Sequence, residues 1–492
     1  MAAGDGAAIA ARGSLFLPSS GAPMNAAMPF DPEQLRRYDR PGPRYTSYPA
    51  APHFTATFGA PELRAYAARS NALAGKRPLS LYVHVPFCFS PCFYCGCNRV
   101  ITRDLTRGEH YADDLLTEIR LLAPHFDPAR EVVQLHLGGG TPNFLAEETL
   151  ERLIAGAGRV FRLSDAADRD FSIELDPRSL PGPPTRYAAT LARLGFNRAS
   201  LGVQDFDPDV QRAVNRMQSV EETLDLIDAC RDQGFRSINV DLIYGLPGQT
   251  PERFQRTLRT VMSARPDRIA VYGYAHLPAL FKAQRRIDPT RLPGAAARLD
   301  LLRLAIEELS ADGYRYIGMD HFALPDDELV HAQERGGLQR NFMGYTTHAD
   351  CDLIGVGASA ISHIADSYSQ NFRELGSWKA ALEESRLPVW RGLALTFDDR
   401  VRGAVIGQLM CQGVIDAAAI QRHYGIDFAA YFAEAMEQLR ALTDDGLVRM
   451  AHGEIAATSV GRLLLRNIAM CFDRYLAAPA PAAGSVPLSR AV

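Results

Sequence analysis

Four cysteines fall within ten residues of this chain, and this short run limits the possible fold and chemistry more than any other feature. It reads Val85-Pro-Phe-Cys-Phe-Ser-Pro-Cys-Phe-Tyr-Cys-Gly-Cys97, so Cys88, Cys92 and Cys95 have the spacing C-x3-C-x2-C and Cys97 follows. Eight cysteines placed independently along 492 residues would give about 0.002 such triplets, so chance does not explain the run. Three thiolates on one loop suit three irons of a [4Fe–4S] cube and leave the fourth iron open to another ligand.

Two other uses of these cysteines remain open at this point, a structural zinc site and buried free thiols. Zinc usually takes its cysteines as two separated pairs or together with histidines, so the single compact triplet favours iron and sulfur. The other four cysteines are scattered singly, which argues against a disulfide framework and for a reducing compartment. They are Cys230, Cys351, Cys411 and Cys471.

Length and composition are those of a globular, cytoplasmic enzyme. A chain of 492 residues can form two or three domains, and a net charge of −4 gives no basic field for nucleic acid. No stretch approaches 18 apolar residues, so we expect no membrane span. Residues 1–28 are rich in Ala, Gly and Ser, which predicts a disordered extension, with an organelle-targeting segment as the weaker alternative. Residues 477–492 predict a flexible tail.

Between these ends, strands and helices alternate. Six strand–helix repeats imply a parallel sheet with right-handed crossovers, either open or closed into a partial barrel. Polar motifs follow the strand ends, where α/β folds build their sites, and this favours the barrel. The predicted strands are Ser80–Val85, Val132–Leu137, Phe171–Leu175, Ala199–Val203, Ser237–Ile243 and Arg268–Tyr274, and two clear helices are Glu109–Leu122 and Val220–Gln233.

Candidate ligand-binding residues lie in, at the end of or directly after four of the predicted strands. The segment Leu137-Gly-Gly-Gly-Thr-Pro142 can bring its backbone close to a ligand, although it can also be read as a tight turn. Glu174 ends the third strand and can bind a cationic or hydroxyl group, unless it is simply an exposed acid. Gln204 ends the fourth strand. Asp241 interrupts an apolar strand, and because a buried unpaired carboxylate is costly, we expect a ribose hydroxyl or an arginine as its partner.

The cysteine run, with Tyr94 before its third cysteine, resembles the signature of the radical S-adenosylmethionine enzymes. From about Asp39 to Val492 the chain resembles one family among them, the oxygen-independent coproporphyrinogen III oxidases (coproporphyrinogen dehydrogenases). Besides the cysteine run, the segments that carry the resemblance are Arg44-Tyr-Thr-Ser-Tyr-Pro49, Leu201-Gly-Val-Gln-Asp-Phe206, Val240-Asp-Leu-Ile-Tyr-Gly-Leu-Pro247, Tyr274-Ala-His-Leu-Pro278, Ile317-Gly-Met-Asp-His-Phe-Ala323, Arg340-Asn-Phe-Met-Gly-Tyr-Thr-Thr347 and Ile354-Gly-Val-Gly-Ala-Ser-Ala-Ile-Ser362.

The resemblance implies an α/β fold, a partial (β/α)6 radical S-adenosylmethionine barrel with an N-terminal arm and a mainly helical C-terminal domain. It implies a [4Fe–4S] cluster on Cys88, Cys92 and Cys95, with Cys97 as a catalytic residue that does not bind the cluster. It also implies two S-adenosylmethionine molecules. The cluster-bound molecule is expected to meet Tyr82, Gly139, Glu174 and Ile361, and the second Tyr94, Gly140, Thr141, Gln204, Arg216, Asp241 and Ala275.

The implied reaction belongs to anaerobic haem (porphyrin) biosynthesis. A 5′-deoxyadenosyl radical takes hydrogen from a propionate of coproporphyrinogen III, and loss of CO₂ and an electron leaves a vinyl group. A second round gives protoporphyrinogen IX. The expected partners are the substrate and a reduced electron donor such as flavodoxin or ferredoxin, and we expect a monomer with no nucleic-acid or membrane partner. Arg44 and Arg340 are candidates for binding substrate carboxylates, with surface salt bridges as the plain alternative.

The expected domains are an extension (1–28), an N-terminal arm (29–78), the barrel with its extension (79–370), a helical capping domain (371–476) and the tail (477–492). Helices are expected at Phe428–Asp445 and Val460–Ala477, with a small hairpin of Leu447–Met450 and Glu454–Ala457. Such a bundle with a two-stranded wing could also dock DNA, but Phe428–Asp445 carries acidic residues where a basic stripe is needed.

Two alternative functions remain. One is a haem chaperone related to the same family, which binds haem without oxidase activity; Cys97 and the segment Arg44–Pro49 speak against it. The other is a non-catalytic iron–sulfur or redox-sensing protein, which the series of ligand-contact positions after successive strands makes improbable.

Overall fold

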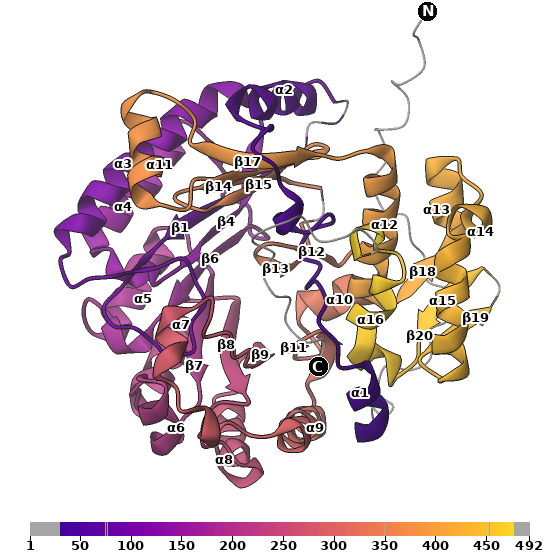
Figure 1. Cartoon of the computed structure of the whole chain (residues 1–492). Helices are drawn as coiled ribbons and strands as arrows, with labels where there is room; N and C mark the ends of the chain where they lie inside the picture. The colour runs from indigo at the N-terminus through magenta and orange to yellow at the C-terminus, as the bar shows by residue number, and fades with distance from the viewer. Residues whose placement is uncertain (1–29, 74, 76, 349, 452, 477–492) are drawn as a thin grey trace, which may run out of the picture. The chain divides into compact units, whose positions relative to one another are not determined.

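The computed structural model describes residues 30–73, 75, 77–348, 350–451 and 453–476. The predicted extension (1–28) and tail (477–492) lie outside these residues. The chain divides into two compact units (Figure 1). We call Phe54–Pro293 with Asp350–Ala394 the sheet unit, and Met1–His53, Gly294–Ala349 and Leu395–Val492 the helical unit.

The sheet unit is built on the six predicted strands. Strands β1, β4, β6, β7, β8 and β9 are parallel neighbours in the order β9-β8-β7-β6-β4-β1, which confirms the predicted parallel sheet. Strand β14 continues it in parallel, and β15, β16 and β17 follow antiparallel. The bounds are β1 Leu79–Val85, β4 Glu131–Gly139, β5 Arg162–Leu163, β6 Asp170–Leu175, β7 Arg198–Gln204, β8 Ser237–Tyr244, β9 Arg268–Gly273, β14 Asp352–Val356, β15 Ile361–Ile364, β16 Ser367–Asn371 and β17 Val389–Ala394, with a short parallel pair β2 Phe87–Cys88 and β3 Val100–Ile101.

Helices connect these strands and cover the sheet (Figure 1). In α3, the predicted core-facing residues Leu115, Ile119 and Leu122 are buried. Helix α7 begins where the Ser219 hydroxyl accepts the Glu222 N–H at 3.0 Å, and Glu222 accepts the Ser219 N–H in return. The helices of this unit are α2 Ala60–Asn71, α3 Thr106–Leu122, α4 Glu147–Gly158, α5 Pro184–Arg193, α6 Pro208–Ala213, α7 Val220–Asp232, α8 Pro251–Ser263 and α11 Leu375–Glu383.

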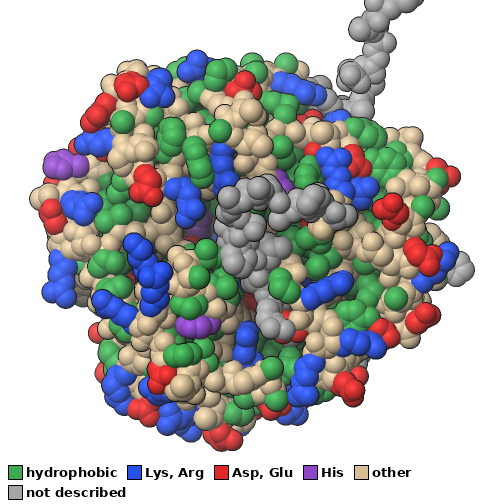
Figure 2. All heavy atoms as spheres, in the orientation of Figure 1, with side chains coloured by type: hydrophobic (Ala, Val, Ile, Leu, Met, Phe, Trp, Pro, Cys, Tyr) green, Lys and Arg blue, Asp and Glu red, His purple; other side chains and the backbone are tan. Residues whose placement is uncertain are grey.

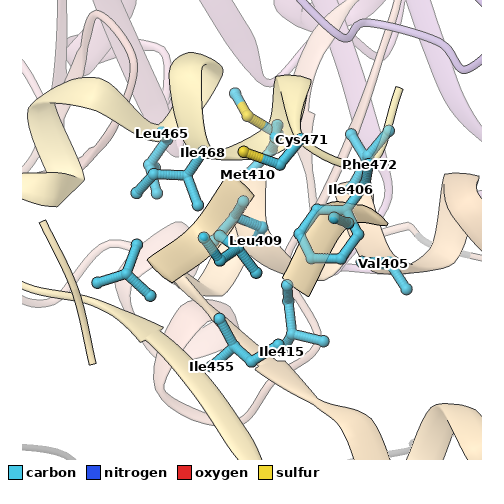
Figure 3. Packing of buried hydrophobic residues seen from close by; sticks show 14 of the residues in the cluster. Val405, Ile406, Leu409, Met410, Ile415, Ile455, Leu465, Ile468, Cys471 and Phe472 are labelled. Atoms are coloured by element: carbon cyan, nitrogen blue, oxygen red, sulfur yellow. The ribbon is translucent and has the colours of Figure 1, made fainter. Parts of the chain in front are cut away.

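The helical unit has its own hydrophobic core, in which α12 and α16 pack with β18 and β20. Figure 3 shows Ile406 and Leu409 facing Leu465, Ile468 and other apolar side chains of this core. The helices are α1 Pro32–Tyr38, α9 Ala295–Ala311, α10 Glu328–Glu334, α12 Phe397–Gln412, α13 Ala417–Tyr424, α14 Phe428–Tyr431, α15 Ala433–Asp444 and α16 Leu465–Met470, and the strands are β10 Arg315–Gly318, β11 His321–Ala323, β12 Gln339–Asn341, β13 Gly344–Thr346, β18 Val414–Asp416, β19 Val448–Ala451 and β20 Glu454–Ala457.

Two helices predicted near the C-terminus are interrupted. The predicted helix Phe428–Asp445 breaks at Phe432, whose ring is 2% exposed and packs 4.8 Å from the ring of Phe428 and 5.3 Å from that of Phe472. The predicted helix Val460–Ala477 is α16 between two 3₁₀ turns, within the part that the structure describes.

The predicted hairpin gains a third strand. Strands β19 and β20 pair as expected, and β18 adds to β20 through Ile415 opposite Ile455, both of them buried. Across the described ranges, no helix is long and apolar enough to cross a membrane. Acidic, basic and hydrophobic side chains are intermingled over the face drawn in Figure 2.

Candidate cluster and cofactor site

The cysteine loop follows directly from the carboxyl end of β1 and is anchored to the segment after α6. The Phe93 N–H donates to the Val214 carbonyl at 2.9 Å, and the Asn215 amide donates to the Pro91 carbonyl at 2.7 Å. Cys88 lies in β2, which pairs with β3 and so ties the start of the loop to its end. The loop is therefore held by the β2–β3 pair and, in its middle, by hydrogen bonds to Val214 and Asn215 within the sheet unit.

Each of the three predicted cluster ligands accepts a hydrogen bond at its sulfur. The Thr141 hydroxyl donates to Cys88 Sγ at 3.4 Å, and the Cys97 N–H donates to Cys95 Sγ at 3.4 Å. Cys92 Sγ accepts from two guanidinium groups, Arg178 Nη2 and Arg216 Nη1, each at 3.6 Å. Such donors stabilise the thiolate form, which is the form that binds iron.

The thiols differ in acidity. Burial raises the pKa of Cys88 to about 11, whereas a hydrogen bond from the Cys97 side chain lowers the pKa of Cys95 to about 6 and raises that of Cys97. Among the described residues, no three His, Cys, Asp or Glu side chains are grouped closely enough to hold one metal ion. A [4Fe–4S] cube does not need three ligands around one ion, since each thiolate binds a different iron.

The glycines after β4 leave no room for side chains. A Cβ on Gly140 would lie 2.7 Å from the backbone carbon and oxygen of Pro86, at the start of the cysteine loop. Gly139 has φ +114°, which other residues rarely adopt, and its Cβ would lie 2.5 Å from the His84 ring. A Cβ on Gly138 would lie 2.8 Å from Glu174 Oε1. The segment is therefore packed against the start of the cysteine loop, His84 and Glu174 so closely that only glycine fits.

Glu174 lies on β6 beside this glycine segment. Its Oε2 accepts the Gly139 N–H at 2.9 Å, and its Oε1 lies 3.4 Å from His136 Nε2. Burial favours the neutral acid, but the hydrogen bonds from His136 and Gly139 outweigh it, so the pKa of Glu174 is lowered. The side chain still keeps 43% exposure, so this anionic carboxylate remains available to a cationic ligand group.

Tyr82 is part of the same polar group. Its ring stacks on His136 with centroids 5.8 Å apart, and its hydroxyl lies 3.0 Å from His84 Nδ1. The other His84 nitrogen, Nε2, lies 3.1 Å from the Asn98 carbonyl, one residue after Cys97. Tyr82 pairs with Gly355 of β14, and a Cβ there would lie 2.5 Å from the Ile361 carbonyl oxygen. This close approach brings Ile361 to the same strand ends as Tyr82.

Gln204 and Arg216 meet over Gly202. Gln204 has φ +69° where β7 has an irregular register, which is an uncommon conformation for a residue with a side chain. A Cβ on Gly202 would lie 2.9 Å from Gln204 Nε2 and 3.1 Å from Arg216 Nη2. Arg216 is 6% exposed, pairs with Asp176 at 3.4 Å and donates to the Gly202 carbonyl, while its Nε is buried without a hydrogen-bond partner in the described structure.

Asp241 lies on β8, between strands β7 and β9, and its hydrogen-bond partners are neutral side chains. Ser200 Oγ donates to its Oδ2 at 3.2 Å and Asn239 Nδ2 to its Oδ1 at 2.9 Å. Burial raises its pKa to about 6, and the nearby Glu174 charge adds to that effect. The sequence suggested an arginine or a ribose hydroxyl as partner. The charge of Arg216 acts on this carboxylate, but the hydrogen bonds come from the two neutral side chains.

Gln284, which the sequence did not single out, connects two expected contacts of the second cofactor molecule. Its Nε2 donates to the Tyr94 carbonyl at 2.8 Å and to the Ala275 carbonyl at 3.2 Å. Sequence reasoning also missed His136, Asp176 and Arg178. Asp176 and Arg178 directly follow the Glu174 strand, and an acid and an arginine two residues apart at a strand end could have signalled them.

The two candidate substrate arginines lie in the helical unit and differ in their surroundings. Arg44 forms an ion pair with Asp320, in line with the plainer alternative of a salt bridge. The Arg340 guanidinium lies 5.2 Å from the Tyr345 ring centroid, and its Nε and Nη1 are buried without hydrogen-bond partners among the described residues. Arg340 therefore has donors to offer to a carboxylate.

Known proteins resemble this chain over nearly its full length. Residues 82–261 match the model of the Radical SAM superfamily, and residues 395–464 match that of the HemN C-terminal domain. Two relatives named "Oxygen-independent coproporphyrinogen III oxidase" come from Pseudomonas aeruginosa (50% identical, covering 91% of this chain and 96% of the relative) and Escherichia coli strain K12 (47%, covering 90% and 94%). A solved structure described as "Coproporphyrinogen III oxidase (HemN) from Escherichia coli is a Radical SAM enzyme" has a TM-score of 0.86 at 45% identity, covering 92% of this chain and 100% of that one.

Proposed function

The chain belongs to the family of oxygen-independent coproporphyrinogen III oxidases, and from this membership we infer that it is an enzyme of anaerobic haem biosynthesis. It decarboxylates two propionate side chains of coproporphyrinogen III oxidatively to vinyl groups and gives protoporphyrinogen IX. Its cofactors are a [4Fe–4S] cluster and S-adenosylmethionine. The predicted fold, a radical S-adenosylmethionine barrel with a helical C-terminal region, is confirmed by the likeness to the solved relative.

One structural observation assigns the cluster and cofactor sites to particular residues. The hydrogen-bonded cysteine loop, the glycine backbone and Glu174 lie in one unit, at the carboxyl ends of the neighbouring strands β1, β4 and β6, and Asp241 lies on β8 of the same parallel sheet. We propose that Cys88, Cys92 and Cys95 bind the cluster. The unpartnered Nε of Arg216 supports a bound cofactor there, since it is a donor that the described protein groups do not use. The glycines Gly138–Gly140 hold the end of β4 against the start of the cysteine loop, His84 and Glu174.

When bound, the cluster and S-adenosylmethionine supply hydrogen-atom abstraction by a carbon radical at the substrate propionate. The chain's own residues bind and orient. Glu174, held anionic by His136 and the Gly139 N–H, would accept hydrogen bonds from the cofactor's amino group. Asp241 and Arg216 would hold a second cofactor molecule together with Gln204, and Gln284 fixes the backbone of Tyr94 and Ala275 beside them.

A substrate with four carboxylates needs guanidinium partners, and Arg340 has two buried donors without partners in the described structure. We propose Arg340 as one of the propionate-binding groups.

We further propose a reduced flavodoxin or ferredoxin as electron donor, a monomeric state and a cytoplasmic location. The eight free cysteines support a reducing compartment. The domain boundaries and the capping role of residues 371–476 stay predictions.

An anaerobic assay tests the function. Full-length protein with a reconstituted cluster should convert coproporphyrinogen III to protoporphyrinogen IX only when S-adenosylmethionine and a reductant are both present, and a Cys95→Ala protein should not. Stable haem binding without conversion would instead support the haem-chaperone alternative. That alternative is not favoured. The two relatives described above are named as oxidases, and this chain covers more than 90% of the length of each.

A further inference from the structure

The three sulfur atoms of the proposed cluster ligands have unequal partners. Cys88 accepts from a neutral hydroxyl and Cys95 from a backbone N–H and the Arg99 side chain, whereas Cys92 accepts from the guanidinium groups of both Arg178 and Arg216. Cys92 is the one of these three whose sulfur accepts from two guanidinium groups. Arg216 is already assigned to the second cofactor molecule by its sequence motif, but Arg178 has no role in the proposed reaction.

Arg178 is held in place by a two-point ion pair. Its Nε donates to Asp176 Oδ1 at 2.9 Å and its Nη2 to Asp176 Oδ2 at 2.6 Å, with side-chain exposures of 16% and 12%. Asn143 fixes the backbone beneath, since its Oδ1 accepts the Asp176 N–H at 2.9 Å and its Nδ2 donates to the Asp176 carbonyl at 3.1 Å. A guanidinium fixed in this way keeps its direction toward Cys92 Sγ.

The same carboxylate also accepts from Arg216. Arg216 Nη1 and Nη2 each lie 3.4 Å from an Asp176 oxygen. Two arginines and one aspartate leave one positive charge in excess beside the Cys92 thiolate. Reduction adds one negative charge to a cluster, so a nearby positive charge and hydrogen bonds to the sulfur favour the reduced form. Asp176 limits that effect while it orients both guanidinium groups.

We propose that Arg178 is a positioning residue that tunes the cluster: held by Asp176, it places a charged N–H donor on the Cys92 thiolate and raises the reduction potential of the cluster. This inference rests on the proposed binding of the cluster by the three cysteines. It assigns Arg178 to the electron-accepting step, at the cluster, and not to the substrate. The alternative role for Arg178 is direct binding of a carboxylate of the cofactor or the substrate.

The test is a redox titration of anaerobically reconstituted full-length protein, followed by the electron paramagnetic resonance signal of the reduced cluster, without S-adenosylmethionine or substrate. Arg178→Gln should make reduction at least tenfold less favourable, which for a one-electron couple is a potential at least 59 mV lower. Arg178→Lys, which keeps the charge, should lie between this variant and the wild type. Arg186→Gln is the matched control, because it breaks an exposed ion pair with Glu147 and should leave the potential unchanged.

Asp176→Asn supplies a test of sign. Asn keeps Oδ1 as the acceptor for the Arg178 Nε–H but removes the negative charge, so the potential should shift upward, opposite to Arg178→Gln. A general loosening of the structure would not produce opposite shifts. A wild-type potential in Arg178→Gln would overturn the proposal, even if S-adenosylmethionine bound more weakly. If Arg178→Gln does not retain iron, Asp176→Asn decides: an upward shift supports the proposal, and an unchanged or lower potential overturns it. Iron content of the wild type checks the cluster ligation separately.

Discussion

At the scale of single residues, the proposed cluster ligands differ from Cys97 in what their sulfur atoms contact. Changing Cys88, Cys92 or Cys95 to Ala should abolish the brown chromophore or leave iron far below stoichiometry, because each removes one corner of the cube. Cys97→Ser should keep the iron and lose turnover, since Cys97 is exposed and contacts Cys95 Sγ by hydrogen bonds from its N–H and its side chain. Iron analysis and anaerobic activity check both; loss of iron in Cys97→Ser contradicts the assignment.

Asp241 separates the second cofactor site from the cluster at the same scale. Asp241→Asn keeps the shape and the contact with Ser200, so melting temperature and iron content should stay near wild type. Conversion should fall roughly ten- to a hundredfold, because a hydrogen bond to a charged group contributes about 1.5–3 kcal/mol. Asp225→Asn, at an exposed position of α7, is the control. An unstable, iron-poor Asp241→Asn protein would instead assign Asp241 a structural role.

At the scale of elements, the end of β4 supports the cysteine loop through Gly140. A Gly140→Ala side chain would meet backbone atoms of Pro86 and Phe87, at 2.7 and 2.8 Å, and the backbone cannot give way as a side chain can. We expect a loss of about 1–3 kcal/mol in the free energy of unfolding and poor cluster retention. Gly376→Ala on α11, where a Cβ meets nothing within 4 Å, should be neutral in chemical denaturation and iron analysis. Equal effects of the two changes would count against this role of Gly140.

Helix α3 carries a buried acid that predicts a pH dependence. Glu118 is 1% exposed and accepts from the Gly357 N–H, Asn371 and Trp378 Nε1, yet burial raises its pKa to about 7. The folded chain therefore holds this proton up to a higher pH than the unfolded chain, whose Glu118 has a pKa near 4.5. The contribution of Glu118 to the free energy of unfolding is therefore at its maximum below pH 4.5. It falls by about 3 kcal/mol as the pH rises through about 7.

Denaturant unfolding of cluster-free wild type and Glu118→Gln between pH 4.5 and 8 measures this contribution. The difference in unfolding free energy between the two proteins should fall with rising pH, and it should level off above about pH 7.5. Asp241 has the same buried environment in both proteins, so its own titration cancels in the difference. Parallel stability curves would show that Glu118 does not titrate as its burial implies.

At the scale of the whole molecule, the expected contacts of both cofactor molecules lie in the sheet unit. Two propionates become two vinyl groups, so we expect two S-adenosylmethionine molecules to be consumed for each protoporphyrinogen IX formed. Quantifying methionine and porphyrin from the same anaerobic reaction checks the ratio. One methionine per product, or none, would contradict this stoichiometry.

Local patterns were enough to predict the elements that depend on local chemistry. The six parallel strands follow from continuous apolar runs, and the cysteine loop and the Gly138–Gly140 segment follow from residue types and spacing. Local patterns failed where distant residues decide the backbone. The predicted helix Phe428–Asp445 is interrupted at Phe432, whose ring packs against that of Phe472, and Ile415 adds a third strand by pairing opposite Ile455.

The sequence by itself determined the α/β class, the cluster loop and the polar residues placed at the strand ends, because each depends on periodicity or on close spacing along the chain. Only the tertiary structure decided which partners those polar groups have. It gave Asp241 the neutral Ser200 and Asn239, gave Glu174 a histidine, and turned Arg178 toward Cys92, 86 positions away in the chain. The physical reason is that the charge state and direction of a buried group are set by neighbours from other strands, and adjacency in the sheet has no counterpart in sequence spacing.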